Sequence, residues 1–161
     1  MQSNGQLIGV FVCNVIRVHA WYKAVAFYTG SLEGKNGNMA GKMLYRLAEK
    51  RCKNYKTCTG EMSKVNKEIL RQFSDGKRKL NQGKCQEIHP IKKKIINLMS
   101  IPLIQGTLRY AYKIARGDGT TKEKAEGVAF LGAILPRLHS CSHQDADIVR
   151  KHMWIVGDME W

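Results

Sequence analysis

The sequence predicts an all-α fold, a single-domain bundle of about five or six helices with an irregular N-terminal arm. Apolar residues recur at spacings of three and four along most of the chain, which is the period of an amphipathic helix, and no alternating strand pattern persists. The 161 residues are 43% hydrophobic with only three prolines, which is typical of one globular domain. We expect residues 1–19 to form an arm or the remnant of a targeting sequence, 20–157 the bundle, and 158–161 a tail.

The first third of the chain gives the weakest helical pattern. The apolar run 7–16 is compatible with a strand or a helix, and it is far shorter than the ~20 residues that cross a membrane, so we expect no transmembrane span. A short helix is predicted over Ala20–Tyr28, followed by a glycine-rich loop. From Ala40 the apolar spacing then predicts a helix that continues to about Tyr55.

The middle of the chain carries the clearest helices. Ser63 is a suitable N-cap for the next helix, and Gly83 is the residue expected beyond its C-terminus. Its apolar stripe consists of Val65, Ile69, Phe73, Gly76 and Leu80. A long apolar pattern then extends from Ile88 to Ala115, and Pro102 predicts either a kink near Ser100 or two helices that meet there.

The last two helices have recognisable N-termini. Thr120 with Glu123 three residues later predicts a capping box after the turn at 116–119. Pro136 is expected to end or bend the helix that follows. Ser142 with Asp145 predicts a short final helix that continues to about Met153.

The charge balance is the unusual feature of the composition. There are 27 Lys and Arg residues against 13 Asp and Glu residues, which gives a formal net charge of +14. Such an excess favours anionic partners, namely nucleic acid, an acidic lipid surface or an acidic protein, and it disfavours collection of free cations. The basic residues are dispersed without a zinc-finger or RNA-binding signature, so a solvated basic surface is the simplest interpretation and nucleic-acid binding has little support.

Five cysteines, at positions 13, 52, 58, 85 and 141, bear on the compartment. Their spacing fits neither a redox pair nor a zinc site. We favour Cys52–Cys58 and Cys85–Cys141 disulfides in an oxidising compartment, with Cys13 unpaired. The alternative is five reduced and partly buried thiols.

Candidate metal ligands lie at three places. Glu126 lies in the first two turns of an apolar helix, where a carboxylate paired with Lys or Arg is the simplest interpretation and a ligand role is the alternative. His139 and His143 are four residues apart, and Asp147 follows, so this group could hold Fe or Zn, although a capped turn with surface histidines explains the same pattern. Glu33 lies in the glycine-rich loop, which otherwise indicates turn chemistry.

Catalysis has no motif to support it. The sequence has no Gly-x-Ser-x-Gly elbow and no P-loop, and we expect a protein that is not an enzyme. An aromatic cluster next to the apolar N-terminal run is instead typical of a core or of an anchor to a partner protein. Its members are Trp21, Tyr22, Phe27 and Tyr28.

Five segments in order resemble one repeat unit of a known family. They are "WYKAVAFYTGSLEG", "GKMLYRLAEKRCKNYKTC", "SKVNKEILRQFSDGKRKLNQGKC", "IPLIQGTLRYAYKIA" and "KAEGVAFLGAILPRLHSC", together spanning about 21–153. They resemble the algal low-iron-inducible, high-carbon-dioxide-responsive proteins of extracellular iron assimilation. The resemblance implies a helical, secreted or periplasmic protein that binds iron or an iron complex and catalyses no known reaction.

The basic charge leaves a second interpretation open. Members of that family tend to carry several units and many acidic residues, whereas this chain has one unit and a net positive charge. The alternative is a basic structural subunit that docks on an acidic or membrane-associated complex, such as a photosynthetic complex in the thylakoid lumen. Residues 6–28 would then form the anchoring arm. A nucleic-acid-binding bundle is the third alternative.

Overall fold

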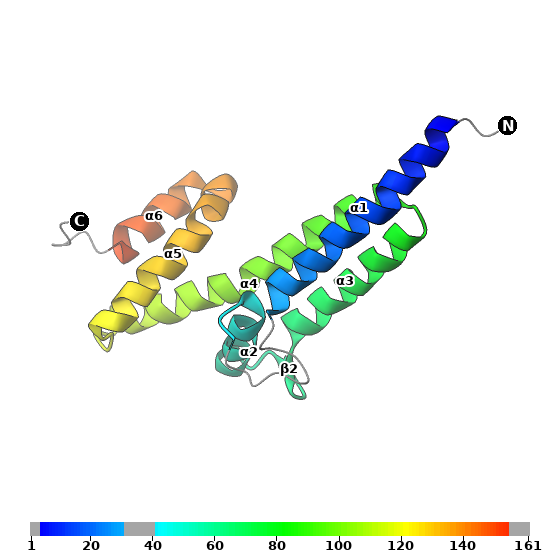
Figure 1. Ribbon diagram of the computed structural model, residues 1–161. Helices are drawn as coiled ribbons and strands as arrows, with labels where there is room; N and C mark the ends of the chain where they lie inside the picture. The colour runs from blue at the N-terminus through cyan, green and yellow to red at the C-terminus, as the bar shows by residue number, and fades with distance from the viewer. Residues whose placement is uncertain (1–3, 31–40, 155–161) are drawn as a thin grey trace. The chain divides into compact units, whose positions relative to one another are not determined.

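The computed structural model describes residues 4–30 and 41–154, with side chains from Arg17 onward, and it confirms the all-α class. The described residues form six α-helices, one 3-10 turn and one two-stranded hairpin (Figure 1). The helices are α1 (Asn4–Thr29), α2 (Leu44–Tyr55), α3 (Lys64–Asn81), α4 (Ile88–Ala115), α5 (Thr121–Cys141) and α6 (His143–Met153). The hairpin pairs β1 (Cys58–Thr59) with β2 (Met62–Ser63), and the 3-10 turn is Cys85–Glu87.

The chain divides into two compact units where one domain over 20–157 was expected. Unit 1 is Met1–Met99 and unit 2 is Ser100–Trp161, so the division falls inside α4, close to Pro102. Helix α1 also runs across the expected boundary at residue 19. In the part of the chain that the structure describes, no helix combines the length and the apolar character needed to cross a bilayer. The expected tail at 158–161 lies outside the described residues.

The core of unit 1 forms where α1, α3 and the first half of α4 lie side by side (Figure 1). Its buried residues are Tyr28, Tyr45, Ile69, Phe73 and Ile95. Trp21 seals one edge of this core: its indole meets the Phe73 ring edge-on at 5.5 Å and its Nε1 donates to the Phe73 carbonyl at 2.9 Å. The helical stripe expected on α3 therefore does face the core.

A buried carboxylate joins α2 to the start of α3. Glu49, only 3% exposed, accepts hydrogen bonds from the Ser63 N–H at 3.0 Å and from Asn66 Nδ2 at 2.6 Å. Asn66 also donates to the Tyr45 carbonyl at 2.9 Å and accepts from the Tyr28 hydroxyl. Burial raises the pKa of Tyr28 well above its ordinary value. These hydrogen bonds satisfy the buried side chains of Glu49 and Asn66 and fix α2 against α3.

Unit 2 packs the second half of α4 against α5 and α6. Phe130 stacks on Tyr110 with ring centroids 5.6 Å apart and lies directly over Gly106. Gly127, in turn, faces Tyr110 and Ile114. Small residues on each helix thus admit a large side chain of the other, which explains the presence of Gly127 and Phe130 on α5.

The local signals for helix ends are confirmed. Ser63 and Ser142 accept the backbone N–H three residues on, and Thr120 and Glu123 form the predicted capping box. Gly83 has a φ of +72°, a conformation that favours glycine beyond a helix end. Of the two alternatives at Pro136, the helix end is wrong, since α5 continues through this residue to Cys141. α4 also continues through Pro102, so the alternative of two separate helices there is wrong.

Candidate binding sites

A cavity with basic residues on its lining lies within unit 1. It has a volume of about 550 Å³ and is bordered by α1, α3, the 3-10 turn and the first half of α4. Trp21, Phe73 and Leu80 supply apolar wall, with Ile95 and Met99 of α4. We call it the basic cavity. Its volume falls in the range of sites that take small ligands.

Basic side chains line part of the basic cavity. Arg17 of α1 and His89 and Lys92 of α4 line it and are exposed to solvent, and no Asp or Glu belongs to its described lining. In the described part of the chain, neither Arg17 nor Lys92 has an ion-pair partner. An apolar wall with convergent positive charge suits an anion that carries an apolar or aromatic body.

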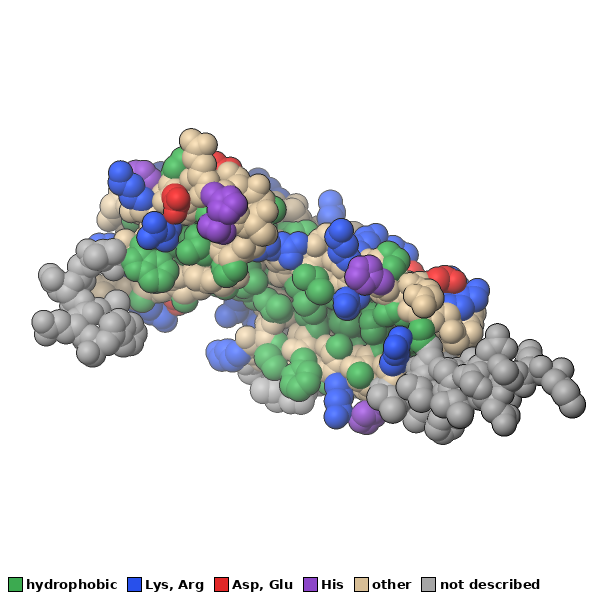
Figure 2. Space-filling view, turned by 90° about the horizontal axis from the view of Figure 1, so that it is seen from above, with side chains coloured by type: hydrophobic (Ala, Val, Ile, Leu, Met, Phe, Trp, Pro, Cys, Tyr) green, Lys and Arg blue, Asp and Glu red, His purple; other side chains and the backbone are tan. Residues whose placement is uncertain are grey.

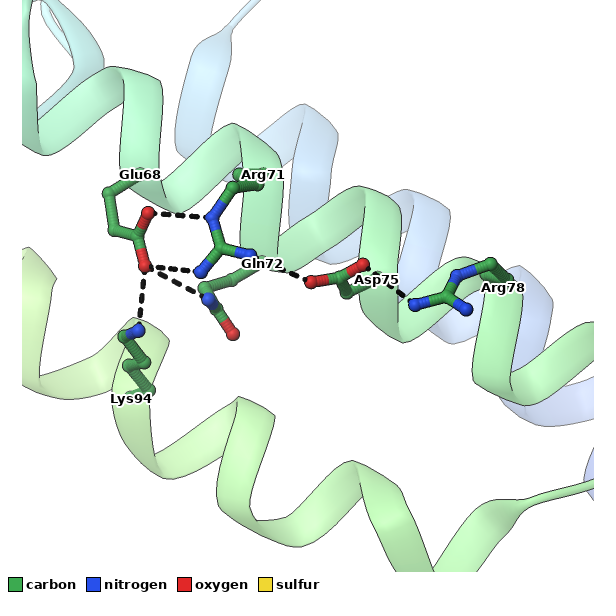
Figure 3. A network of polar contacts seen from close by, with 6 residues as sticks. All are labelled: Glu68, Arg71, Gln72, Asp75, Arg78 and Lys94. Carbon is green, nitrogen blue, oxygen red and sulfur yellow. Dashed lines mark hydrogen bonds and ion pairs between the residues drawn. The ribbon is translucent and has the colours of Figure 1, made fainter.

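The remaining surface is also basic. Figure 2 shows Lys and Arg side chains distributed over the visible face, with few Asp and Glu among them. Several of the described acids are paired with cations. The densest such network joins α3 to α4 (Figure 3): Glu68 accepts from Arg71 Nε at 2.8 Å and from Lys94 Nζ at 2.7 Å. These hydrogen bonds hold the pKa of Glu68 well below its usual range.

The structure does not bring the predicted metal ligands into one group. Among the described residues, no three His, Cys, Asp or Glu side chains lie where they could hold one ion. His139 and His143 do meet, with ring centroids 4.0 Å apart, across the junction of α5 and α6. Asp147 pairs instead with Arg150 at 3.3 Å. Glu33 lies outside the described residues.

Glu126 has a partner that the sequence did not suggest. The Tyr110 hydroxyl donates to its carboxylate, where pairing with a Lys or Arg was expected. Lys113, the cation nearby on α4, pairs with Glu123 one turn earlier on α5. The half-buried Glu126 thus connects α5 to α4 within unit 2.

The predicted aromatic anchor divides into two parts. Tyr28 is 2% exposed and Trp21 packs on Phe73, so both belong to the core of unit 1, which is the core alternative for these two residues. Tyr22 and Phe27 face outward, with Phe27 74% exposed. The four residues lie on one continuous helix, so their side chains point in different directions around its axis, some toward the core and others toward solvent.

One of the two predicted disulfides is confirmed. Cys52 and Cys58 are bonded and close the short segment that leads from α2 into the hairpin. Cys85 is also disulfide-bonded, but Cys141 is a free and exposed thiol, so the predicted Cys85–Cys141 bridge is wrong. The prediction for the Cys13 side chain falls outside the described residues.

Sequence reasoning missed the basic cavity and one buried cation. Arg17 and Lys92 come together only because α1 packs on α4, and nothing in their local sequence indicates that. Arg51 of α2 is only 8% exposed, and its Nε and Nη1 have no hydrogen-bond partner in the described structure. An arginine in the middle of a highly charged helix reads as a surface residue, so its burial could not be foreseen.

Comparison with known proteins finds no relative of this chain. The chain matches no family model, no curated protein and no solved structure.

Proposed function

We propose that this chain is a non-enzymatic helical binding protein of the iron-assimilation type, which takes iron as an anionic complex in the basic cavity. The observation that carries the proposal is the lining of that cavity, in which Arg17, His89 and Lys92 accompany apolar residues and no described carboxylate occurs. Bare Fe³⁺ would be repelled there, whereas a ferric chelate with net negative charge would be attracted. The net charge of +14 adds long-range attraction of the same sign.

The aromatic residues in the lining of the cavity indicate which kind of iron complex should bind most tightly. Trp21 and Phe73 present ring surface, and Arg17 and Lys92 present positive charge at its border. A chelate whose organic ligand carries aromatic rings would gain both contacts, so a ferric catecholate should bind more tightly than ferric citrate.

A disulfide supports the proposed compartment. Cys52–Cys58, together with the bonded Cys85, is typical of proteins that fold under oxidising conditions. We therefore place the protein outside the cell or in the periplasm, with the thylakoid lumen as the alternative.

Equilibrium dialysis against radiolabelled iron tests the binding proposal. Ferric catecholate and ferric citrate should each bind at one saturable site, and ferrous sulfate should not. The double variant Arg17→Gln with Lys92→Gln should weaken binding at least tenfold. Lys67→Gln with Lys93→Gln, which removes the same charge from exposed positions outside the cavity, should have little effect.

Two results would refute the proposal. Equal weakening in both double variants would mean that overall charge alone attracts the complex. Saturable binding of bare ferrous iron without binding of either chelate would mean that the protein holds the ion through its own ligands.

A docking subunit is the second candidate, and the outward-facing aromatics favour it. Phe27 is 74% exposed and Tyr22 is 47% exposed on the same helix, and Lys77 lies over the Tyr22 ring at 5.1 Å. Aromatic and cationic groups together suit an acidic protein surface or a membrane-associated complex. Phe27→Ser should then reduce retention on such a complex while leaving chelate binding intact. Unchanged retention together with weakened chelate binding would exclude docking through Phe27.

A further inference from the structure

A second cavity, separate in chemistry from the basic cavity, lies within unit 2. It has a volume of about 350 Å³ and is bordered by the second half of α4, by α5 and by α6. Its wall is aliphatic. The residues that matter most are Ile104 and Leu108 of α4, Ile134 and Leu138 of α5, and Val149 and Met153 of α6. We call it the aliphatic cavity.

The polar groups of this cavity are few and differ in kind. Thr107 donates its hydroxyl to the Leu103 carbonyl at 3.1 Å, so its hydrogen bond is made within its own helix. Arg137 is exposed and is the charged residue of the described lining, which contains no Asp or Glu. Cys141 adds an exposed free thiol one turn further along α5. One wall therefore offers a positive charge at the edge of an otherwise apolar space.

The wall chemistry selects the ligand. A flexible aliphatic chain fills a narrow space between branched side chains, and it gains affinity with each buried methylene. A carboxylate on that chain would carry the charge opposite to that of Arg137, the cation of the lining. Aromatic walls, which would favour a flat ring ligand, are missing from the described lining.

From these observations we infer that the aliphatic cavity binds a medium-chain fatty acid. The chain lies between α4, α5 and α6, and the carboxylate lies at Arg137. Binding is non-covalent and independent of the iron complex, because the two cavities share no residue.

The reactivity of the Cys141 thiol reports whether a ligand occupies the aliphatic cavity. Because this free thiol lines the cavity, a bound chain should slow its reaction with N-ethylmaleimide, and peptide mass spectrometry identifies the modified site. Laurate at saturation should slow the reaction at least fivefold. Octanoate, decanoate and laurate should bind in increasing order, by about fourfold for each added methylene until the cavity is full.

Two pairs of variants separate the head group from the chain. Arg137→Gln should weaken laurate at least tenfold and leave dodecanol unaffected, whereas Lys151→Gln, an exposed cation of α6 outside the lining, should alter neither. Ala111→Leu places a larger side chain in the cavity and should shorten the longest chain that binds. Ala133→Leu, an exposed change on α5, should not.

The contrary results are distinct. Tight binding of dodecanol and laurate alike, unchanged by Arg137→Gln, would overturn the carboxylate site. Unchanged Cys141 reactivity at saturating laurate would overturn the location. If the thiol is instead protected by raised protein concentration alone, the cavity is covered by a second copy of the chain, and the fatty acid site is excluded.

Discussion

The indole of Trp21 lies against Gly76, so close that a β-carbon on Gly76 would be 2.0 Å from Cζ2 of the ring. Two carbon atoms that are not bonded to each other cannot lie so close, so the helix or the indole would have to move. The absence of a side chain at this one position of α3 is what lets α1 approach it, and the Trp21 indole then reaches the Phe73 carbonyl.

Gly76→Ala should therefore destabilise the protein. Overpacking of this kind typically costs about 1–3 kcal/mol in the free energy of unfolding, because the bulky indole must leave its place against Phe73. Urea unfolding followed by tryptophan fluorescence would measure the loss, and the emission of Trp21 should move to longer wavelength in the native state.

Gly132→Ala is the matched control, since it also replaces a glycine within a helix. A β-carbon there meets nothing within 4 Å, so the gain in helix propensity should raise the free energy of unfolding by about 0.5–1 kcal/mol. Opposite signs for the two variants are expected. Equal effects would mean that contact with Trp21 does not determine the cost at Gly76.

The carboxylate of Glu68 should make stability depend on pH in the acid range. Its pKa is lowered in the folded state, first by Arg71 and then by Lys94, so its contribution is present above the ordinary value of 4.5 and is lost as the pH falls below it. Because the pairs are partly exposed, Glu68→Gln should cost no more than about 1 kcal/mol at neutral pH.

Urea unfolding from pH 7 to pH 3 would check this expectation. The difference between wild type and Glu68→Gln should shrink as the pH falls below about 4.5 and should also shrink in concentrated salt. Glu61→Gln, which alters an exposed carboxylate in the hairpin turn, supplies the baseline. A constant difference across the range would contradict a role for ionised Glu68.

The hydroxyl of Tyr28 should limit stability in the alkaline range. Its pKa is raised above 10.0 by burial, so the folded state keeps the proton while the unfolded chain releases it. The contribution of this hydroxyl to the free energy of unfolding is fully present below the pKa of tyrosine in the unfolded chain, and it decreases as the pH rises above that pKa. Tyr28→Phe should lose about 1–2 kcal/mol at pH 7, because Asn66 loses a donor. The difference in free energy of unfolding between wild type and Tyr28→Phe should decrease between about pH 10 and 11. Chemical unfolding at a series of pH values would measure it.

Arg51 should be replaceable with a gain in stability. Its guanidinium is buried, and two of its nitrogens have no hydrogen-bond partner in the described structure. Arg51→Met keeps much of the apolar length and removes the desolvated charge, so the free energy of unfolding should rise by about 1 kcal/mol or more. Lys50→Met, at the exposed neighbouring position, should change it by less than about 0.5 kcal/mol. A large loss with Arg51→Met would show that the charge has a partner in solution.

Local features of this fold could be predicted from sequence, and relations between helices could not. The caps at Ser63, Thr120 and Ser142 depend on residues three positions apart, which the chain displays directly. The Tyr110 partner of Glu126 depends instead on which helix lies opposite. A helical period also does not tell Trp21, which faces inward, from Tyr22, which faces outward, until neighbouring helices are placed.

The same limit explains the candidate sites. The positive charge of the chain was evident, and it pointed to an anionic ligand. The cavity that could hold such a ligand is made by residues of three separate helices, and each has an ordinary local setting. The proposed metal ligands show the same limit. His139, His143 and Asp147 are near in sequence, but the two histidine rings meet each other while Asp147 pairs with Arg150 three residues on along α6.

The thiol of Cys141 has a practical consequence for anyone handling the purified protein. Being exposed and unbonded, it can couple two molecules through air oxidation, so a species of doubled mass should accumulate on non-reducing gels during storage. Adding reductant to prevent this would endanger the Cys52–Cys58 bond, and Cys141→Ser is the safer remedy.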